Sequence, residues 1–233
     1  MKIHRFFGNF VIVDNRIVID DGELVHQIKN VLHLKVGERI LLCNEDKSEY
    51  MAEIMHIEKN INTKIISSGK NKNESKRNVH LYLSILKKEN FELAVQKAVE
   101  VGINTITPLV TDRTVKLDIK RERVLKIIKE AAEQSERGII PELKEITNLS
   151  DVIKEKRSGI TFFCDRSGDN LHNSIKKMKK GNIINVFVGP EGGWSETELE
   201  YARENKFLIV NLGKFTLRGE TAAIVASYLF SNS

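Results

Sequence analysis

The stretch that decides the fold of the C-terminal half is Asn182-Ile-Ile-Asn-Val-Phe-Val-Gly-Pro-Glu-Gly-Gly-Trp-Ser-Glu-Thr-Glu-Leu199. Its apolar, β-branched start predicts a buried strand, and Ser195 three residues before Glu198 predicts a capping box at a helix N-terminus. The order is therefore strand, glycine loop, helix. Such a loop lies at the carboxyl end of its strand, where open α/β sheets bind ligands, and glycines let backbone amides approach a ligand closely. An ordinary glycine-rich connection is the alternative.

A second glycine turn follows the next apolar run, in Asn211-Leu-Gly-Lys-Phe-Thr-Leu-Arg-Gly-Glu-Thr-Ala-Ala223. It places Arg218 and Glu220 directly before a helix with almost no polar face, which predicts a helix covered on most sides. Charged groups at the mouth of a buried element cost desolvation energy unless they pair or serve a ligand. Two interpretations stay open: a salt bridge between Arg218 and Glu220 that only fixes the loop, or a site.

The two stretches together resemble the RsmE family of knotted, SPOUT-class methyltransferases, which modify N3 of a uridine in small-subunit ribosomal RNA. The resemblance rests on Gly189-Pro-Glu-Gly-Gly193 and Leu212-Gly-Lys-Phe-Thr-Leu-Arg-Gly-Glu-Thr-Ala222. Further matches are Arg5-Phe-Phe7, His33-Leu-Lys-Val-Gly37, Gln96-Lys-Ala-Val-Glu-Val-Gly102 and Glu130-Ala-Ala-Glu-Gln-Ser-Glu-Arg137, so the likeness spans nearly the whole chain. Two positions depart from the family pattern: Gly219 stands where Thr is usual, and Phe215-Thr-Leu217 where Arg-Ile-Leu is usual.

The resemblance implies a methyl donor, S-adenosylmethionine, held against the backbone of the two glycine turns. The implied cofactor-binding residues are Val188, Gly189, Pro190, Glu191, Gly192, Gly193, Leu212, Gly213, Thr216, Leu217 and Ala222. Arg218 is the candidate catalytic residue, because its guanidinium can bind a uracil carbonyl or the target phosphate, and Glu220 or a water it holds is the candidate proton acceptor. The resemblance also implies a C-terminal trefoil knot and a homodimer.

Length, charge and cysteine content limit the class of protein. A chain of 233 residues can bury one large core or two modest ones. The net charge of +5 suits an anionic partner, but it is also common for a solvated surface. Cys43 and Cys164 are far apart in apolar runs, which predicts buried free thiols. With no signal-peptide core and no membrane-length apolar run, a cytoplasmic protein is expected.

Three kinds of site are not predicted. The six histidines show no metal-ligand spacing, so no metal is expected. The glycine patterns of dinucleotide-binding folds and P-loops do not occur. An aromatic content of 6% argues against a base-stacking sheet of the RRM kind.

Residues 1–70 are predicted to form a small β-rich domain. Strand patterns occur at 10–13, 16–19, 39–43, 48–54 and 61–66. Asp14-Asn15 predicts a two-residue turn, and apolar residues from Leu24 to Leu32 recur at helical spacing after a candidate N-cap at Asp20-Asp21. The resemblance implies a PUA-like RNA-binding β-barrel, whereas the residues alone allow a structural or dimer-forming module equally well.

Residues 71–78 are polar and predict a linker, after which 79–233 alternate between strand and helix patterns. Strands are expected at 79–86, 105–110, near 143, at 160–164, 183–188 and 207–212, and helices at 90–101, 119–137, 149–156, 171–180, after Ser195 and at 221–230. Such alternation predicts an α/β domain with a mostly parallel sheet. The basic cluster at 175–180 is interpreted as cations at a helix C-terminus.

Several cationic and polar residues are candidates for contacts with ribosomal RNA or the small ribosomal subunit. These candidates are Arg5, Arg113, Arg121, Arg123, Gln134 and Arg137. Arg113 follows a strand on the ligand side of the sheet, Arg121 and Arg123 belong to a basic helix face that could equally be solvated, and the family match carries Gln134 and Arg137.

The apolar C-terminal helix, with Ile224, Val225, Tyr228, Leu229 and Phe230, predicts a dimer interface. Two rivals to the methyltransferase interpretation remain: a non-catalytic rRNA-binding assembly factor, and a SPOUT methyltransferase acting on another RNA position.

Overall fold

The computed structural model describes residues 3–171, 174 and 183–232. It divides into two compact units: unit 1 comprises Met1–Glu74 and Ala132–Ile140, and unit 2 comprises Ser75–Ala131 and Pro141–Ser233. Most of the helix predicted at 171–180, with its basic cluster, lies outside the described residues.

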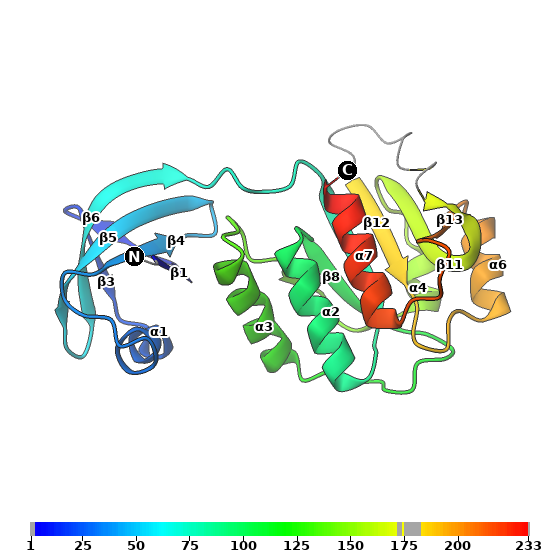
Figure 1. The fold of residues 1–233 in the computed structure, drawn as a ribbon, viewed down its shortest axis with the longest axis horizontal. Helices are drawn as coiled ribbons and strands as arrows, with labels where there is room; N and C mark the ends of the chain where they lie inside the picture. Colours follow the sequence, from blue (N-terminus) through cyan, green and yellow to red (C-terminus); the bar gives the residue numbers. More distant parts are fainter. Residues whose placement is uncertain (1–2, 172–173, 175–182, 233) are drawn as a thin grey trace. The chain divides into compact units, whose positions relative to one another are not determined.

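Unit 1 is built on a six-stranded sheet (Figure 1). In spatial order its strands are β1 (His4–Phe7), β4 (Arg39–Cys43), β5 (Ser48–Ile57), β6 (Ile61–Lys70), β3 (Arg16–Ile19) and β2 (Ile12–Val13). The first pair, β1 with β4, is parallel and the other neighbours are antiparallel. Asp14 and Asn15 both have positive φ (48° and 60°), as a two-residue hairpin turn requires, so the predicted turn is confirmed. Closure of the sheet into a barrel stays a prediction.

One helical segment covers the apolar face of this sheet. Helix α1 (Gly22–His26) continues into a π-helical turn, η1 (Gln27–Val31). The predicted cap is Asp21, whose carboxylate accepts a hydrogen bond from the Leu24 amide at 2.8 Å. Leu24 and Ile28 are buried in the core of unit 1, as the helical spacing predicted.

Unit 2 contains a sheet whose paired strands are all parallel, confirming the predicted α/β class. In spatial order its strands are β10 (Thr147–Asn148), β8 (Thr105–Val110), β7 (Asn78–Ser84), β12 (Ile183–Val188), β11 (Ile160–Asn170) and β13 (Leu208–Asn211), with β9 (Glu142–Leu143) also on β8. The sequence patterns missed β1 and β10, because strands this short carry little periodic signal.

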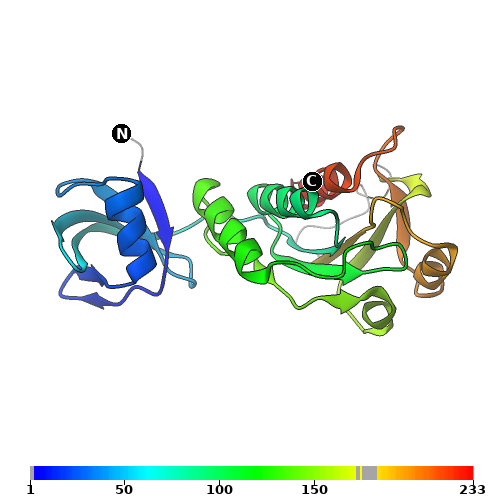
Figure 2. The same cartoon turned by 90° about the horizontal axis from the view of Figure 1, so that it is seen from below.

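Helices lie on both faces of the parallel sheet, as Figure 2 shows. On one face α7 (Gly219–Asn232) packs on β7, β12 and α2 (Lys88–Glu100). On the other face α4 (Leu149–Lys154) and α6 (Glu196–Glu204) contribute to a core that includes Phe187 and Trp194. Helix α3 (Arg121–Gln134) crosses the division between the units. None of the helices among the described residues has the length and apolar character needed to span a membrane.

The predicted linker 71–78 is anchored at both of its ends. Within unit 1, the amide group of Asn71 donates to Glu49 at 2.6 Å and to the Glu136 carbonyl at 3.2 Å. Within unit 2, buried Arg77 donates to the Phe230 carbonyl at 3.4 Å. The polar composition of this segment therefore reflects hydrogen bonding as well as solvation.

Candidate active site

A cavity of about 320 Å³ lies at the carboxyl ends of β12 and β13, beside residues 164–166 of β11. Every residue that was predicted to bind the cofactor lines it: Val188, Gly189, Pro190, Glu191, Gly192, Gly193, Leu212, Gly213, Thr216, Leu217 and Ala222. The two glycine turns, distant in sequence, are thus brought to one place at the ligand-binding edge of the sheet. That these residues hold a cofactor stays a prediction.

Two glycines of this cavity are required by backbone geometry or close packing. Gly193 has φ +68°, a left-handed conformation that other residues adopt at a cost. A Cβ on Gly189 would come within 2.9 Å of the Trp194 ring. Gly192 does not have a positive φ, and a Cβ there would meet Arg113 carbons at 3.4 Å. Of these two neighbouring glycines, only Gly193 therefore has a backbone conformation that favours glycine.

Seven lining residues were not predicted from the sequence. They are Cys164, Asp165, Arg166, Trp194, Asn211, Phe215 and Gly219. Cys164 ends the strand predicted at 160–164, and Asp165 and Arg166 follow it, so their place at the predicted carboxyl end was the signal that could have found them, although β11 continues to Asn170. The other four residues lie within the two quoted glycine stretches, but no residue pattern indicated that they line a cavity.

Trp194 forms a wall of the cavity. Its indole Nε1 donates to the Cys164 carbonyl at 2.9 Å, and its ring lies 4.1 Å from the Phe163 ring. Burial, followed by the nearby charge of Asp165, raises the pKa of the Cys164 thiol to about 12. Cys164 is therefore a protonated thiol at neutral pH and unsuited to nucleophilic chemistry.

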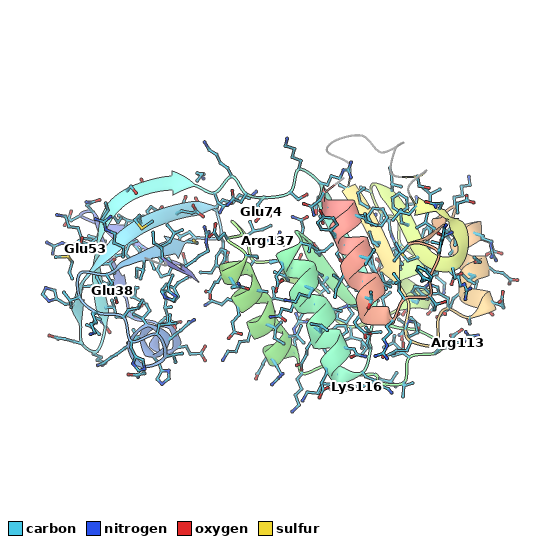
Figure 3. The ribbon with its side chains drawn as sticks, viewed as in Figure 1. Glu38, Glu53, Glu74, Arg113, Lys116 and Arg137 are labelled. Atoms are coloured by element: carbon cyan, nitrogen blue, oxygen red, sulfur yellow. The ribbon has the colours of Figure 1, made fainter. Side chains whose placement is uncertain are left out.

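A hydrogen-bonded ring holds the glycine loop to the turn after β8. Ser195 Oγ donates to Asp112 Oδ2 at 2.5 Å, and the Asp112 amide donates to Glu198 Oε1 at 2.9 Å. The capping box that the sequence predicted completes this ring, because Glu198 Oε2 accepts from the Ser195 amide at 2.8 Å. Beside it, Arg113, labelled in Figure 3, donates to the Gly192 carbonyl at 2.8 Å. The predicted RNA contact Arg113 thus lies at the glycine loop.

Arg218 and Glu220, the candidate catalytic residues, differ in their surroundings. Arg218 is exposed, while Glu220 is 8% exposed and its Oε2 has no hydrogen-bond partner among the described residues. They flank Gly219, which lines the cavity. No ion pair joins the two side chains in the described part of the chain, so the structure lacks the salt bridge that the purely structural interpretation requires.

Two predicted RNA contacts are buried inside unit 1. Arg5 Nη1 donates to Glu49 at 2.5 Å and to the Arg137 carbonyl at 2.9 Å. Arg137 pairs with Glu74 at 2.8 Å, and both carry labels in Figure 3. The side chains of Arg5 and Arg137 are only 8% and 5% exposed. A phosphate contact by either residue is therefore not favoured, because each guanidinium already has protein acceptors and little exposed surface.

The remaining RNA candidates lie on or near the surface of α3. Arg121 donates to the carbonyls of Leu143 (2.9 Å) and Lys144 (3.0 Å), and the exposed Arg123 pairs with Glu92 at 2.8 Å. Gln134 is exposed at the helix end. These contacts leave part of each side chain open to solvent, so RNA contacts here stay predictions. Among the described residues, no three His, Cys, Asp or Glu side chains gather as metal ligands would.

Comparison with known proteins identifies the family. A model of the RNA methyltransferase domain matches residues 73–231, and a model of the RNA methyltransferase PUA domain matches residues 19–66. The chain is 32% identical to ribosomal RNA small subunit methyltransferase E of Rickettsia conorii, over 97% of this chain and 94% of that protein. The Bacillus subtilis protein of the same name is 30% identical, over 88% and 86%.

A solved structure agrees with these matches. Ribosomal RNA small subunit methyltransferase E from Neisseria gonorrhoeae, crystallised with S-adenosyl methionine, superposes with a TM-score of 0.87 and 28% identity, over 97% of this chain and 95% of that one. The matched methyltransferase domain, residues 73–231, includes every residue that lines the cavity. The chain belongs to the ribosomal RNA small subunit methyltransferase E family.

Proposed function

We propose that this protein transfers the methyl group of S-adenosylmethionine to N3 of a uridine in the RNA of the small ribosomal subunit. Family membership makes it an S-adenosylmethionine-dependent rRNA methyltransferase. The N3 position and the roles of individual residues are the proposed part. The observation that carries the proposal is the cavity at the carboxyl ends of the parallel strands β12 and β13, lined by both glycine stretches.

The residues present fit the cofactor. A cavity of about 320 Å³ is within the usual size range for small-molecule sites. Gly193 at φ +68° and the exposed Gly213 at φ +150° leave backbone groups unobstructed by a Cβ, as close contact with an adenine edge requires. The bound sulfonium supplies an already activated methyl group, so the protein has to orient the partners and stabilise charge.

Arg218 is proposed to stabilise the negative charge that spreads onto the uracil carbonyls when N3 loses its proton. Arginine stays protonated at any working pH, so it is not the base. Its planar fork can bind a carbonyl or phosphate oxygen in a fixed direction. Its exposure beside the lining residues Leu217 and Gly219 leaves this fork available.

Glu220 is proposed as the proton acceptor, directly or through a water. A buried carboxylate oxygen without a partner is costly, and a polar ligand or water that reaches it removes that cost.

A homodimer is proposed through the exposed side of α7. Tyr228 is 56% exposed, and Ile224, Val225 and Leu229 are partly exposed. Phe230 was also expected at this interface, but it is fully buried with its ring 4.5 Å from that of Phe162, so it belongs to the core. A monomer by light scattering at micromolar concentration contradicts this part of the proposal.

Three further features are proposed on the strength of the family. Unit 1, which contains the PUA-like domain and Gln134, contacts the RNA, as do Arg113, Arg121 and Arg123 of unit 2. A trefoil knot forms near the C-terminus, where the chain leaves β13 at one edge of the sheet and returns as α7 to its centre. A ribosomal substrate implies action in the cytoplasm.

The deciding experiment maps methylation in small-subunit RNA from a strain that lacks this protein. We expect one uridine to lose its N3 methyl group, and purified protein with S-adenosylmethionine to restore it on the isolated subunits. Arg218→Ala protein serves as the control for contaminating activity. Loss of a methyl group at another atom or nucleotide supports the second rival. An unchanged methylation map, with no saturable heat when S-adenosylmethionine is titrated, supports the non-catalytic rival.

A further inference from the structure

Phe215 is an aromatic side chain at the cofactor cavity that gains almost nothing from the protein core. It lines the cavity, yet 84% of it is exposed. Aromatic side chains are among the largest contributors to core packing, so one left this open at a ligand site is better explained by a contact outside the fold.

The loop that carries Phe215 is anchored at the next residue. Arg166 Nη1, on the extended strand β11, donates to Thr216 Oγ1 at 2.9 Å. Thr216, Leu217 and Arg166 line the cavity as well. Phe215 is thereby held at the cavity mouth by a contact that connects its loop to the sheet.

Exposed cations lie in the loop that carries Phe215 and on the strand that anchors this loop. Lys214 and Arg218 belong to the same loop and are exposed, as is Arg166. The acidic residues of the cavity have protein donors: Asp165 Oδ1 accepts from the Ser167 amide and hydroxyl, and Glu191 Oε1 accepts from the Lys87 amide. An aromatic ring among exposed cations is the composition with which proteins hold single-stranded nucleic acid, the ring for a base and the cations for phosphates.

We propose that Phe215 stacks on the target uracil at the cavity mouth, with Lys214 and Arg166 balancing the flanking phosphates. This inference rests on the proposed methylation of N3. Stacking uses the face of the uracil ring, so the N3 edge stays free to point at the methyl donor and the carbonyls stay free for Arg218. Because N3 of a paired uridine lies inside the base pair, the enzyme needs an unpaired base, and an aromatic platform stabilises an unpaired base outside a helix.

The test compares Phe215→Ala, Phe215→Leu and Phe215→Tyr on small subunits purified from a strain lacking the protein. Ala and Leu are expected to raise KM for the subunit by roughly 5- to 100-fold, while Tyr stays within about 2-fold of wild type. Affinity for S-adenosylmethionine, followed by the fluorescence of the sole tryptophan, Trp194, in the cavity wall, is expected to stay unchanged in all three. Tyr201→Ala on α6 is the matched control, an aromatic that is 46% exposed, and is expected to leave KM unchanged.

Each other outcome overturns the proposal. Leu behaving like wild type shows that an apolar group suffices and no ring stacks. A matching loss of cofactor affinity shows that Phe215 covers the cofactor instead. Dissociation of an oligomer on substitution shows that the ring packs against a second copy. If wild-type protein transfers no methyl group to the subunit, the proposed function itself fails, which is a separate result.

Discussion

Residue type does not distinguish the arginines of unit 1 from those of unit 2, but their side chains differ in what they contact. Arg5 and Arg137 are buried: Arg5 binds Glu49 and the Arg137 carbonyl, and the Arg137 side chain binds Glu74. Arg166 and Arg218 are exposed beside the cavity. All of them could have been assigned to RNA from residue type alone. The difference teaches that pairing and burial, which only the structure provides, decide whether an arginine stabilises the fold or remains available to a substrate.

The largest expected effect on stability comes from breaking the buried pair of unit 1. Among the residues that the structure describes, Arg137→Ala leaves Glu74 with the Gly138 and Ile139 amides as its donors. We expect a loss of about 3–5 kcal/mol in the free energy of unfolding of unit 1, measured by urea denaturation. The control Arg123→Ala, which breaks an exposed pair with Glu92, is expected to cost no more than about 1 kcal/mol. Equal losses of unfolding free energy in Arg137→Ala and Arg123→Ala contradict the difference drawn between buried and exposed arginines.

Removing Arg218 is expected to lower activity and to leave stability nearly unchanged, the opposite of removing Arg137. Arg218→Ala should lower single-turnover methylation by roughly 10²–10³-fold, the usual cost of one preorganised donor to the transition state. Since the side chain is exposed and no ion pair of it is seen among the described residues, melting temperature and cofactor affinity should stay near wild type. Arg218→Lys should rescue little, because a point charge does not reproduce the fork. A joint loss of stability and cofactor affinity in both variants restores the structural interpretation.

Three glycine variants separate backbone strain from cavity filling. Gly193→Val and Gly37→Val both force a positive φ (+68° and +89°) on a β-branched residue, at about 1–3 kcal/mol of stability. Gly192→Val adds no such strain but fills space beside Arg113. We expect both cavity variants to lose S-adenosylmethionine binding by calorimetry, and Gly37→Val in unit 1 to retain it. Normal binding by Gly192→Val shows that the loop is only a connection.

The smallest expected effect is a pH dependence from the half-buried imidazole of His80. Burial, with the charges of Lys144 and Arg157, lowers the pKa of His80 to about 4. The unfolded chain, with a pKa near 6.5, therefore binds a proton first, and stability falls as pH drops from about 6.5 to about 4. The loss should reach about 2 kcal/mol after allowing for partial solvent screening. His80→Asn should flatten this part of the curve, whereas substitution of the exposed His56 should not.

Glu74 contributes to the pH dependence of stability in a different way from His80. Burial alone would raise its pKa, but the hydrogen bond and charge of Arg137 outweigh burial and hold the pKa below its usual value. A carboxyl with a lowered pKa stabilises the fold above its unfolded pKa and loses that contribution as pH falls further. Arg137→Ala should therefore change the acid limb from about pH 4.5 downward, whereas His80→Asn should change it from about pH 6.5 downward. The same change of the stability curve in both variants contradicts this assignment.

Much of the architecture was predictable because its signals are local. The capping box at Ser195, the turn at Asp14-Asn15 and the cap at Asp21 each depend on a few neighbouring residues, and all three are present in the structure. The parallel sheet was predictable from alternating strand and helix patterns, since short crossovers leave few other solutions. The glycine stretches likewise predicted where the cavity lies.

The rest depends on contacts between distant residues, which no local pattern contains. Arg137 and Glu74 were individually ordinary charges, and only folding brings them to 2.8 Å. Phe230 was predicted at a dimer interface, but its ring packs against that of Phe162 in the core. Arg166 and Phe215 join the site because two loops meet, and neither residue type is a strong signal by itself.

The parallel pairing of β7 with β12 has a consequence for the life of the enzyme in the cell. Asn78 pairs with Ile183, so the sheet that ends in the cavity exists only after most of unit 2 has folded. A cofactor that binds only this folded state stabilises it by about 2.7 kcal/mol at 100 times its Kd. Proteases degrade the open chain, so the abundance of the enzyme is expected to follow the supply of S-adenosylmethionine. A shortage of methyl donor would then remove the catalyst as well as its substrate.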